Sequence, residues 1–251
     1  MKKILFALLL LPVIGFSQTF VTEAKIEYEK TVNTKKLMEK RNIPDAFKDG
    51  MPKETKNYYD LLYKNNQSLY QKGRDPELKS APAFMFGGGQ DDRKVFNDYQ
   101  TGQVTQKKAI IWGDDYFIQD TMYKINWRIT MDTRNIAGYE CRRATAVLFD
   151  SVFVVAFYTD EIVGNGGPES FGGLPGMILG LAIPRIHTTW YATTVRPALL
   201  SKEAEQLKAP VAGRRTKLYN YKTATEKIQE ITKSWTWESS NNHQYLWNIL
   251  W

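Results

Sequence analysis

Three side chains in the second half of the chain are of types that bind soft metal ions. Cys141 offers a thiol, Met177 a thioether and His187 an imidazole, and this ligand set suits copper. Cys141 and Met177 also stand in apolar stretches typical of a core. A two-residue turn at Pro184–Arg185 would point His187 away from the face of Met177. A copper-handling site using Cys141 and His187, with Met177 as a third ligand, is our alternative function.

Hydrolytic chemistry has less support. The chain has two histidines, His187 and His243, and neither a G-x-S-x-G elbow nor an H-E-x-x-H motif. Paired acids stand at Asp91–Asp92, Asp114–Asp115 and Asp160–Glu161. All three pairs fall at expected turns, where solvated carboxylates are the ordinary outcome. We find no catalytic motif, and an envelope hydrolase is our third function.

Aromatic side chains favour binding instead. Trp112, Trp127, Phe157 and Trp190 fall in or beside strand-like stretches. A curved sheet that turned them inward would enclose a pocket for an apolar or peptide ligand, unless they simply fill a core. The candidate binding residues are Trp127, Cys141, His187 and Trp190.

Short strands are the elements that would position these residues. Residues 22–31 alternate between apolar and charged, the period of a half-buried strand. Asn65–Asn66 and Asp150–Ser151 are expected as tight hairpin turns, and the second would pair Val147 with Val154. Further strands are expected at 58–63, 68–70, 95–99, 104–112, 116–119, 125–130, 139–149, 152–159, 177–183 and 187–195, the 125–130 strand ending at a turn over 132–135.

Helix is expected mainly near the C-terminus. Thr223-x-x-Glu226 is a capping box that predicts a helix over about 224–238. A short helix is expected over 201–208 and another within 34–56, and a flexible loop over about 72–93. Consecutive antiparallel strands predict a mainly β domain over 18–251, a curved antiparallel β-meander or half-barrel covered by the C-terminal helix, with α+β character.

The first residues indicate export. Lys2 and Lys3 precede an apolar run over 4–14 and then Gly15-Phe16-Ser17-Gln18, a pattern typical of a signal peptide over 1–17. The apolar run is shorter than the roughly 20 residues that span a bilayer. We therefore expect a protein of the periplasm or the outer-membrane periphery.

The net charge limits the class of binding partner, and the cysteine content excludes an internal disulfide. The formal net charge is +7, or +5 without Lys2 and Lys3, which predicts no nucleic-acid binding. A basic group at Arg214, Arg215 and Lys217 leaves peripheral contact with an anionic membrane surface open. Cys141 is the single cysteine, so no internal disulfide forms.

One stretch combines dense glycine and proline with an apolar run. Gly173-Leu174-Pro175-Gly176 leads directly into residues 177–183. Proline locks φ, and glycine reaches conformations closed to other residues. Because no helix follows, the stretch lacks what makes glycine-rich loops bind anions. We interpret it as a rigid reversal that delivers Leu174 to the core and sets the register of the next strand.

Three motifs in one order resemble the GLPGLI family of exported Bacteroidetes proteins. They are residues 125–129, 136–144 and 167–179, and the name-giving hexapeptide reads Gly173-Leu174-Pro175-Gly176-Met177-Ile178 here, with methionine in place of leucine. The resemblance spans roughly residues 125–195. It implies export but no activity, because the family's function is uncharacterised.

We therefore expect a non-catalytic exported protein of the cell envelope. It would bind a protein partner, or an apolar or peptide ligand, in its curved sheet, and it would need no cofactor. Copper remains the cofactor of the alternative function.

Overall fold

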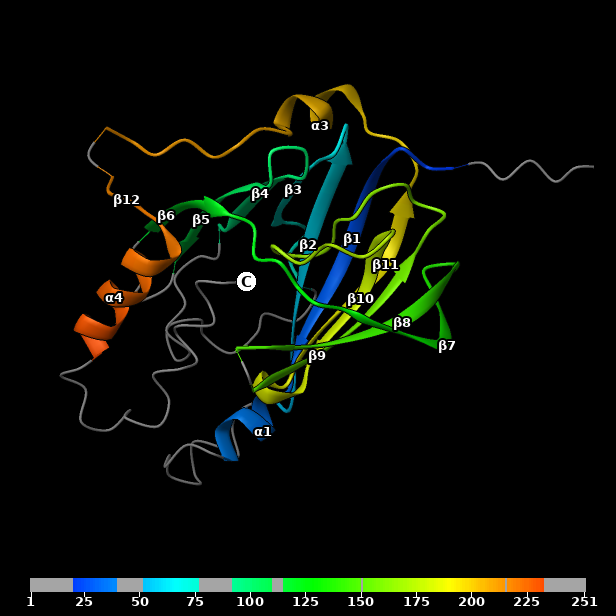
Figure 1. Ribbon diagram of the computed structural model, residues 1–251, viewed down its shortest axis with the longest axis horizontal. Helices are drawn as coiled ribbons and strands as arrows, with labels where there is room; N and C mark the ends of the chain where they lie inside the picture. The colour runs from blue at the N-terminus through cyan, green and yellow to red at the C-terminus, as the bar shows by residue number, and fades with distance from the viewer. Residues whose placement is uncertain are drawn as a thin grey trace, which may run out of the picture.

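The computed structural model describes residues 20–39, 52–76, 92–109, 115–149, 151–214 and 216–232. Several expectations lie outside these residues: the signal peptide over 1–17, most of the loop over 72–93, Trp112 and His243. The elements, drawn in Figure 1, are β1 (Glu23–Val32), α1 (Thr34–Glu39), β2 (Thr55–Lys64), β3 (Gln67–Lys72), β4 (Lys94–Asp98), β5 (Gln103–Ala109), β6 (Asp115–Thr121), β7 (Arg128–Ile136), β8 (Tyr139–Leu148), β9 (Val152–Thr159), β10 (Met177–Ile183), β11 (Thr188–Arg196), α3 (Ser201–Gln206), β12 (Leu218–Tyr219) and α4 (Tyr221–Thr232).

One twelve-stranded sheet contains all of the described strands. Its order is β12-β6-β5-β4-β3-β2-β1-β11-β10-β9-β8-β7, and every pairing is antiparallel except that of β12 with β6. The β2–β3 hairpin turns at Asn65 and Asn66, whose φ values of 51° and 59° confirm the expected tight turn. The prediction of a mainly β, antiparallel architecture is confirmed.

The connection between β6 and β7 requires the sheet to curl. The two strands lie ten strand positions apart in the sheet order, which is about 48 Å in a flat sheet. Seven residue steps join Thr121 to Arg128, and they reach at most about 25 Å. The connection therefore crosses the hollow of a curved sheet, as Figure 1 shows. Its residues Met122, Ile125 and Trp127 pack against the main core.

Alternation along the strands separates an apolar inner face from a charged outer face. On β1, Ala24, Ile26 and Tyr28 are fully buried. Their partners on β2, including Leu61 and Tyr59, are buried on the same face. Period-two alternation therefore produces one continuous core, as expected for the first strand.

Helix α4 covers only one end of the sheet. Its Ala224 and Ile228 pack with Tyr116 and Ile118 of β6 in a small separate cluster. The capping box predicted at Thr223 lies one turn earlier, because the Asn220 side chain accepts from the Thr223 amide at 2.8 Å and the Thr223 hydroxyl accepts from the Asn220 amide at 3.0 Å. The middle of the inner face is covered instead by residues 160–176, between β9 and β10.

Two expected turns are wrong in detail. Phe149 adopts a left-handed φ of 49°, so Leu148 pairs with Val152 and Val147 with Phe153 rather than with Val154. This one-residue shift turns Val147 outward, to 60% exposure. At the next hairpin, a 3₁₀ turn at Pro184–Ile186 and a left-handed His187 lengthen the connection, and Ile183 pairs with Thr188.

The strand expected over 125–130 begins later and continues further. The crossing connection occupies residues up to Trp127, and β7 then runs through the expected turn over 132–135 to Ile136. A bulge between Ile129 and Thr133 absorbs the extra residues. The actual reversal is at Ala137 and Gly138, with φ values of 51° and 88°.

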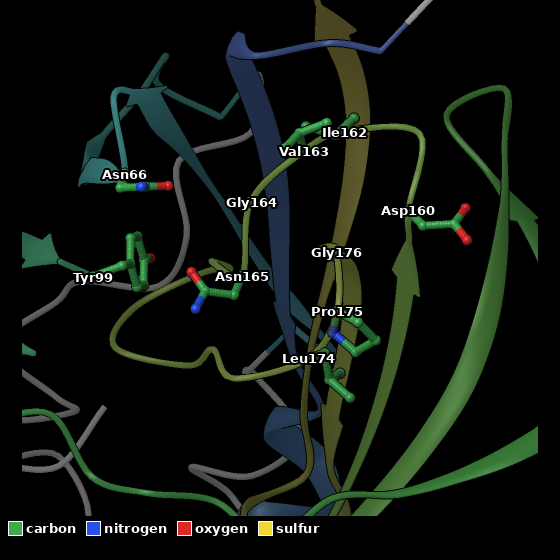
Figure 2. A pocket seen from close by; sticks show the side chains of 10 residues that line it. All are labelled: Asn66, Tyr99, Asp160, Ile162, Val163, Gly164, Asn165, Leu174, Pro175 and Gly176. Carbon is green, nitrogen blue, oxygen red and sulfur yellow. The ribbon is translucent and has the colours of Figure 1, made fainter. Parts of the chain in front are cut away.

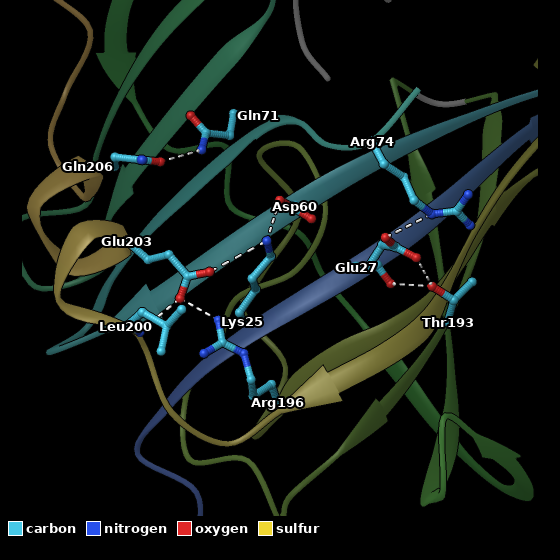
Figure 3. Close-up of polar contacts among 10 residues, drawn as sticks. All are labelled: Lys25, Glu27, Asp60, Gln71, Arg74, Thr193, Arg196, Leu200, Glu203 and Gln206. Carbon is cyan, nitrogen blue, oxygen red and sulfur yellow. Dashed lines mark hydrogen bonds and ion pairs between the residues drawn. The ribbon is translucent and has the colours of Figure 1, made fainter. Parts of the chain in front are cut away.

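A polar network on the outer face holds α3 against β1 and β11 (Figure 3). Glu203 contacts Lys25 at 3.5 Å, forms an ion pair with Arg196 and accepts from the Leu200 amide at 2.8 Å. Lys25 also pairs with Asp60 of β2 at 2.7 Å. Burial raises the pKa of the Glu203 carboxyl, but the Leu200 amide and Arg196 outweigh burial and hold that pKa below its ordinary value.

We expect Glu203→Gln to lower the free energy of unfolding by about 1 kcal/mol at neutral pH. Because the folded state has the lower pKa, Glu203 stabilises the fold above its ordinary pKa of 4.5, and this contribution is lost as the pH falls through the folded pKa. Urea titrations at pH 7 and pH 3 should show the difference shrinking at pH 3. An equal difference at both values would contradict the assignment.

Candidate functional site

Residues 160–176 form a compact covering on the inner face. Ile162, Phe171 and Leu174 are at most 2% exposed, which confirms the expected delivery of Leu174 to the core. The segment is tied by its own backbone, since the Gly173 amide donates to the Asn165 carbonyl at 2.8 Å. The Ile178 amide donates to the Gly166 carbonyl at 2.8 Å, which anchors the segment to the start of β10.

The motif glycines allow two features of this covering. Gly173 has φ +87°, a left-handed conformation that favours glycine. At Gly176 a Cβ atom would collide with the carbonyl oxygen of Thr159, because the chain passes directly against the end of β9. The interpretation of Gly173-Leu174-Pro175-Gly176 as a rigid reversal agrees with both.

An open groove of about 350 Å³ lies beside the motif. Figure 2 shows Asn66, Tyr99 and Asn165 on one side of it and Asp160 on the other. The lining residues are Asn66, Tyr99, Asp160, Ile162, Val163, Gly164, Asn165, Leu174, Pro175 and Gly176. The groove thus offers amide groups and apolar surface together, the combination that recognises a polar ligand with a fixed orientation.

Tyr99 connects the groove to polar groups beneath the covering. Its hydroxyl lies 2.8 Å from the Ser68 hydroxyl, and burial raises the pKa of Tyr99 to about 12. The Asn97 side-chain amide donates to Ser68 at 3.2 Å and to the Glu169 carbonyl at 3.0 Å. A continuous set of hydrogen bonds therefore runs from the groove wall to Glu169.

Glu169 is a fully buried carboxylate held by three cations. Arg93 lies 2.7 Å from it, Lys30 of β1 3.3 Å and Lys108 of β5 3.5 Å. A buried carboxylate without such partners would cost several kcal/mol. Glu169 also has a left-handed φ of 57°, which is uncommon for a residue with a Cβ atom. The ion pairs therefore fix the covering segment in a conformation that its own backbone does not favour.

Aromatic rings surround these cations. The Lys30 ammonium lies 4.9 Å from the centre of the Trp190 ring and 5.6 Å from that of Tyr59. The Arg93 guanidinium lies 5.6 Å from the centre of the Tyr59 ring. Cation–π contacts of this kind add stability where the charge is withdrawn from water.

Lys108 is the most deeply buried of the three cations, with 2% of its side chain exposed. Burial lowers its pKa to about 8. The Glu169 carboxylate opposes this shift, whereas Arg93 and Lys30 add to it. Burying the charged ammonium of Lys108 therefore lowers the stability of the folded protein, and this loss of stability disappears when the ammonium releases its proton.

The predicted binding residues do not form one site, and Trp127 and Trp190 lie apart from Cys141 and His187 in their contacts. Trp127 donates from its indole nitrogen to the Gly172 carbonyl at 2.9 Å, so it braces the covering segment. Trp190 is fully buried beneath Lys30. Trp127 thus contacts the covering segment directly, and Trp190 packs against Lys30, which pairs with Glu169 of that segment. Neither side chain lines the groove.

Cys141, Met177 and His187 do not come together. Met177 begins β10 and His187 follows its end, so roughly 20 Å of strand separates them. Burial raises the pKa of the Cys141 thiol to about 12, whereas metal binding needs a thiolate. His187 lines a second cavity of about 350 Å³ with Thr31 and Asn33. Within the described residues, no group of three His, Cys, Asp or Glu side chains is placed to hold a metal ion.

The charge cluster is the part of the site that sequence reasoning missed. Lys30 follows the buried Tyr28 by two residues on β1, and Lys108 follows the buried Gln106 by two residues on β5. Because residues two apart on a strand share a face, the alternation pattern contained a signal of buried cations. Glu169 lies within the motif over 167–179, where only the glycines and proline received attention. Their convergence depends on residues 139 and 61 positions apart in the chain, which no local pattern reveals.

A family model supports the resemblance at the third of the three motifs, residues 167–179. The model described as "Protein of unknown function (Porph_ging)" matches residues 148–180, which include β9, Glu169 and the hexapeptide. The resemblance to the GLPGLI family is confirmed. The matched residues are thus β9, the covering segment and the start of β10.

Solved structures share the fold of this chain. A structure of PNGF-II in the P21 space group matches with a TM-score of 0.52 and 13% identity, over 82% of this chain and 32% of PNGF-II. A second, in the C2 space group, matches with a TM-score of 0.50 and 12% identity, over 90% and 33%. The chain spans about a third of the length of PNGF-II, and identities this low show the fold alone. No curated protein matches the chain.

We expect Gly176→Ala to lower the free energy of unfolding by more than about 3 kcal/mol, because the new methyl group meets the backbone of Thr159. Gly176→Val should prevent folding. Gly102→Ala is the control: Gly102, unlike Gly176, has a positive φ, but it has open space around it, so a loss near 1 kcal/mol is expected from backbone strain alone. Denaturant titration measures both, and similar losses would contradict the close approach at Gly176.

We expect Lys108→Met to change the pH dependence of stability. Between pH 8 and 10.5 the unfolded chain keeps the Lys108 proton that the folded chain releases, so wild-type stability should rise relative to the variant. The rise should be on the order of 1–3 kcal/mol. Urea titrations at several pH values measure the free energy of unfolding. For Lys202→Met, at an exposed position of α3, this free energy should change with pH as it does in the wild type. If the free energy of unfolding of Lys108→Met also changed with pH as in the wild type, the burial of a charged lysine at this position would be contradicted.

Proposed function

We propose that this chain is a non-catalytic, exported protein of the cell envelope that binds an extended segment of a partner protein. The groove beside Gly173–Gly176 is the observation that carries the proposal. Export is supported by the basic and apolar pattern over residues 1–17. In the described residues, no helix has the length and apolarity to cross a membrane.

The groove suits a peptide backbone. Asn66 and Asn165 are exposed at its rim, and each carboxamide both donates and accepts hydrogen bonds, as a peptide group requires. Tyr99, Leu174 and Pro175 supply adjacent apolar surface. The covering segment is braced by Trp127 and by the Glu169 ion pairs, so the rim is held in one shape before binding, which reduces the entropy lost on association.

A ligand inside the curved sheet has less support. Tyr28, Tyr59, Tyr70 and Trp190 are at most 3% exposed, and residues 160–176 lie over them. These four side chains therefore fill a core, and Trp190 is the one among them that the sequence offered as a pocket residue. Binding is better supported at the edge of the covering segment than beneath it.

Groove blockage tests the proposal. Asn165→Arg places a long side chain at the rim, and Asn126→Arg makes the same change at an exposed position outside the groove. Protein would be purified from its native envelope and examined by native mass spectrometry. We expect a co-purifying polypeptide with the wild type and Asn126→Arg, and at least a tenfold lower yield with Asn165→Arg.

Melting temperatures of both variants should match the wild type within a few degrees, since both side chains are exposed. If Asn165→Arg retained the polypeptide, the partner would bind outside the groove and the proposal would fail. A bound lipid in place of a polypeptide would favour a carrier of apolar ligands.

A further inference from the structure

Strand β7 ends the sheet, and within the described residues it pairs with β8 alone. Eight of its nine residues are at least partly exposed. Among the described residues no strand pairs with its outer backbone edge, although Arg134 and Ile136 near its end pack against Tyr191 and Gly180. An unpaired edge is a template for an added strand. The groove beside Gly173–Gly176 includes no residue of β7, so this surface is separate from the proposed function.

The bulge in β7 presents an apolar side chain in a fixed position. Met131, at its apex, is 98% exposed, and Ile129 before it is 48% exposed. The Thr130 hydroxyl donates to Asp132 at 3.1 Å, and Asp132 pairs with Arg143 of β8 at 2.9 Å. These contacts brace the bulge from both sides of its apex. An exposed methionine on a braced backbone is suited to insert into a partner's pocket.

The charge of the β7–β8 hairpin limits what can dock there. The hairpin carries Arg128, Arg134, Arg142 and Arg143 against Asp132 and Glu140, an excess of two positive charges. Arg143 is paired with Asp132, and Arg134 lies over Tyr191. Within the described part of the chain, Arg128 and Arg142 make no ion pair, and both are exposed. Two copies of this edge would repel each other, whereas an acidic strand would be attracted.

We propose that the β7 edge docks an extended, acidic segment of a partner protein by strand addition. The partner pairs with the regular, exposed stretch over Thr133–Asn135 and receives Met131 in an apolar contact. Arg128 and Arg142 meet its acidic side chains. Main-chain hydrogen bonds supply affinity in this mode, and side chains supply selectivity.

Labelled peptides test the proposal on the full mature chain by fluorescence anisotropy. One probe alternates valine with glutamate and the other valine with lysine. We expect the glutamate peptide alone to bind, more weakly at high salt. Arg128→Glu with Arg142→Glu should reverse the preference, and Met131→Ser should weaken binding about tenfold.

Matched controls separate this edge from general charge and surface effects. Arg214→Glu changes an exposed arginine outside the hairpin, and Val211→Ser removes an apolar side chain that is 87% exposed. Neither should alter binding. Equal weakening by the controls, or no binding of the glutamate peptide, would overturn the proposal. A dimer in sedimentation that Met131→Ser dissociates would assign the edge to a second copy and overturn it too.

Discussion

The burial of one carboxylate organises this molecule. Glu169 is fully buried, and a carboxylate in that position is tolerated only where cations replace its hydration. Lys30, Arg93 and Lys108 come from β1, from the residue preceding β4 and from β5. Because Glu169 belongs to the segment between β9 and β10, its ion pairs join two halves of the sheet that are distant in sequence. The ion pairs act together with the buried side chains of Ile162, Phe171 and Leu174 to hold residues 160–176 against the aromatic core.

This arrangement moves the accessible surface to the margins of the sheet. The covering segment fills the hollow, and the crossing connection from β6 to β7 passes over it, with Trp127 donating to the Gly172 carbonyl. Sheet, covering and connection thus hold one another in place. A ligand cannot replace the covering without separating Glu169 from its cations. The groove at the edge of residues 160–176 and the open strand β7 remain, and both keep their shape because the interior is filled.

Local chemistry made most of the fold predictable. Alternation along β1 and the paired asparagines at 65 and 66 each act over a few residues, and the structure matches them. The errors arose where one residue changed its conformation. Left-handed Phe149 shifted the β8–β9 register, and a bulge carried β7 through an expected turn. Neither change has a strong sequence signal, because phenylalanine seldom adopts positive φ and Asp132 with Thr133 is ordinary turn composition.

The site was harder to predict than the fold because it depends on contacts distant in sequence. The thiol, thioether and imidazole were notable as residue types, yet β10 separates Met177 from His187. Ordinary lysines and a glutamate formed the charge cluster instead, and only their common inner face distinguishes them from solvated charges. The likeness to PNGF-II, at 13% identity, shows the fold alone, and the family model matches a range that contains the covering segment. Because the covering segment closes the interior, the loops and strand edges are the surfaces at which a partner must be sought.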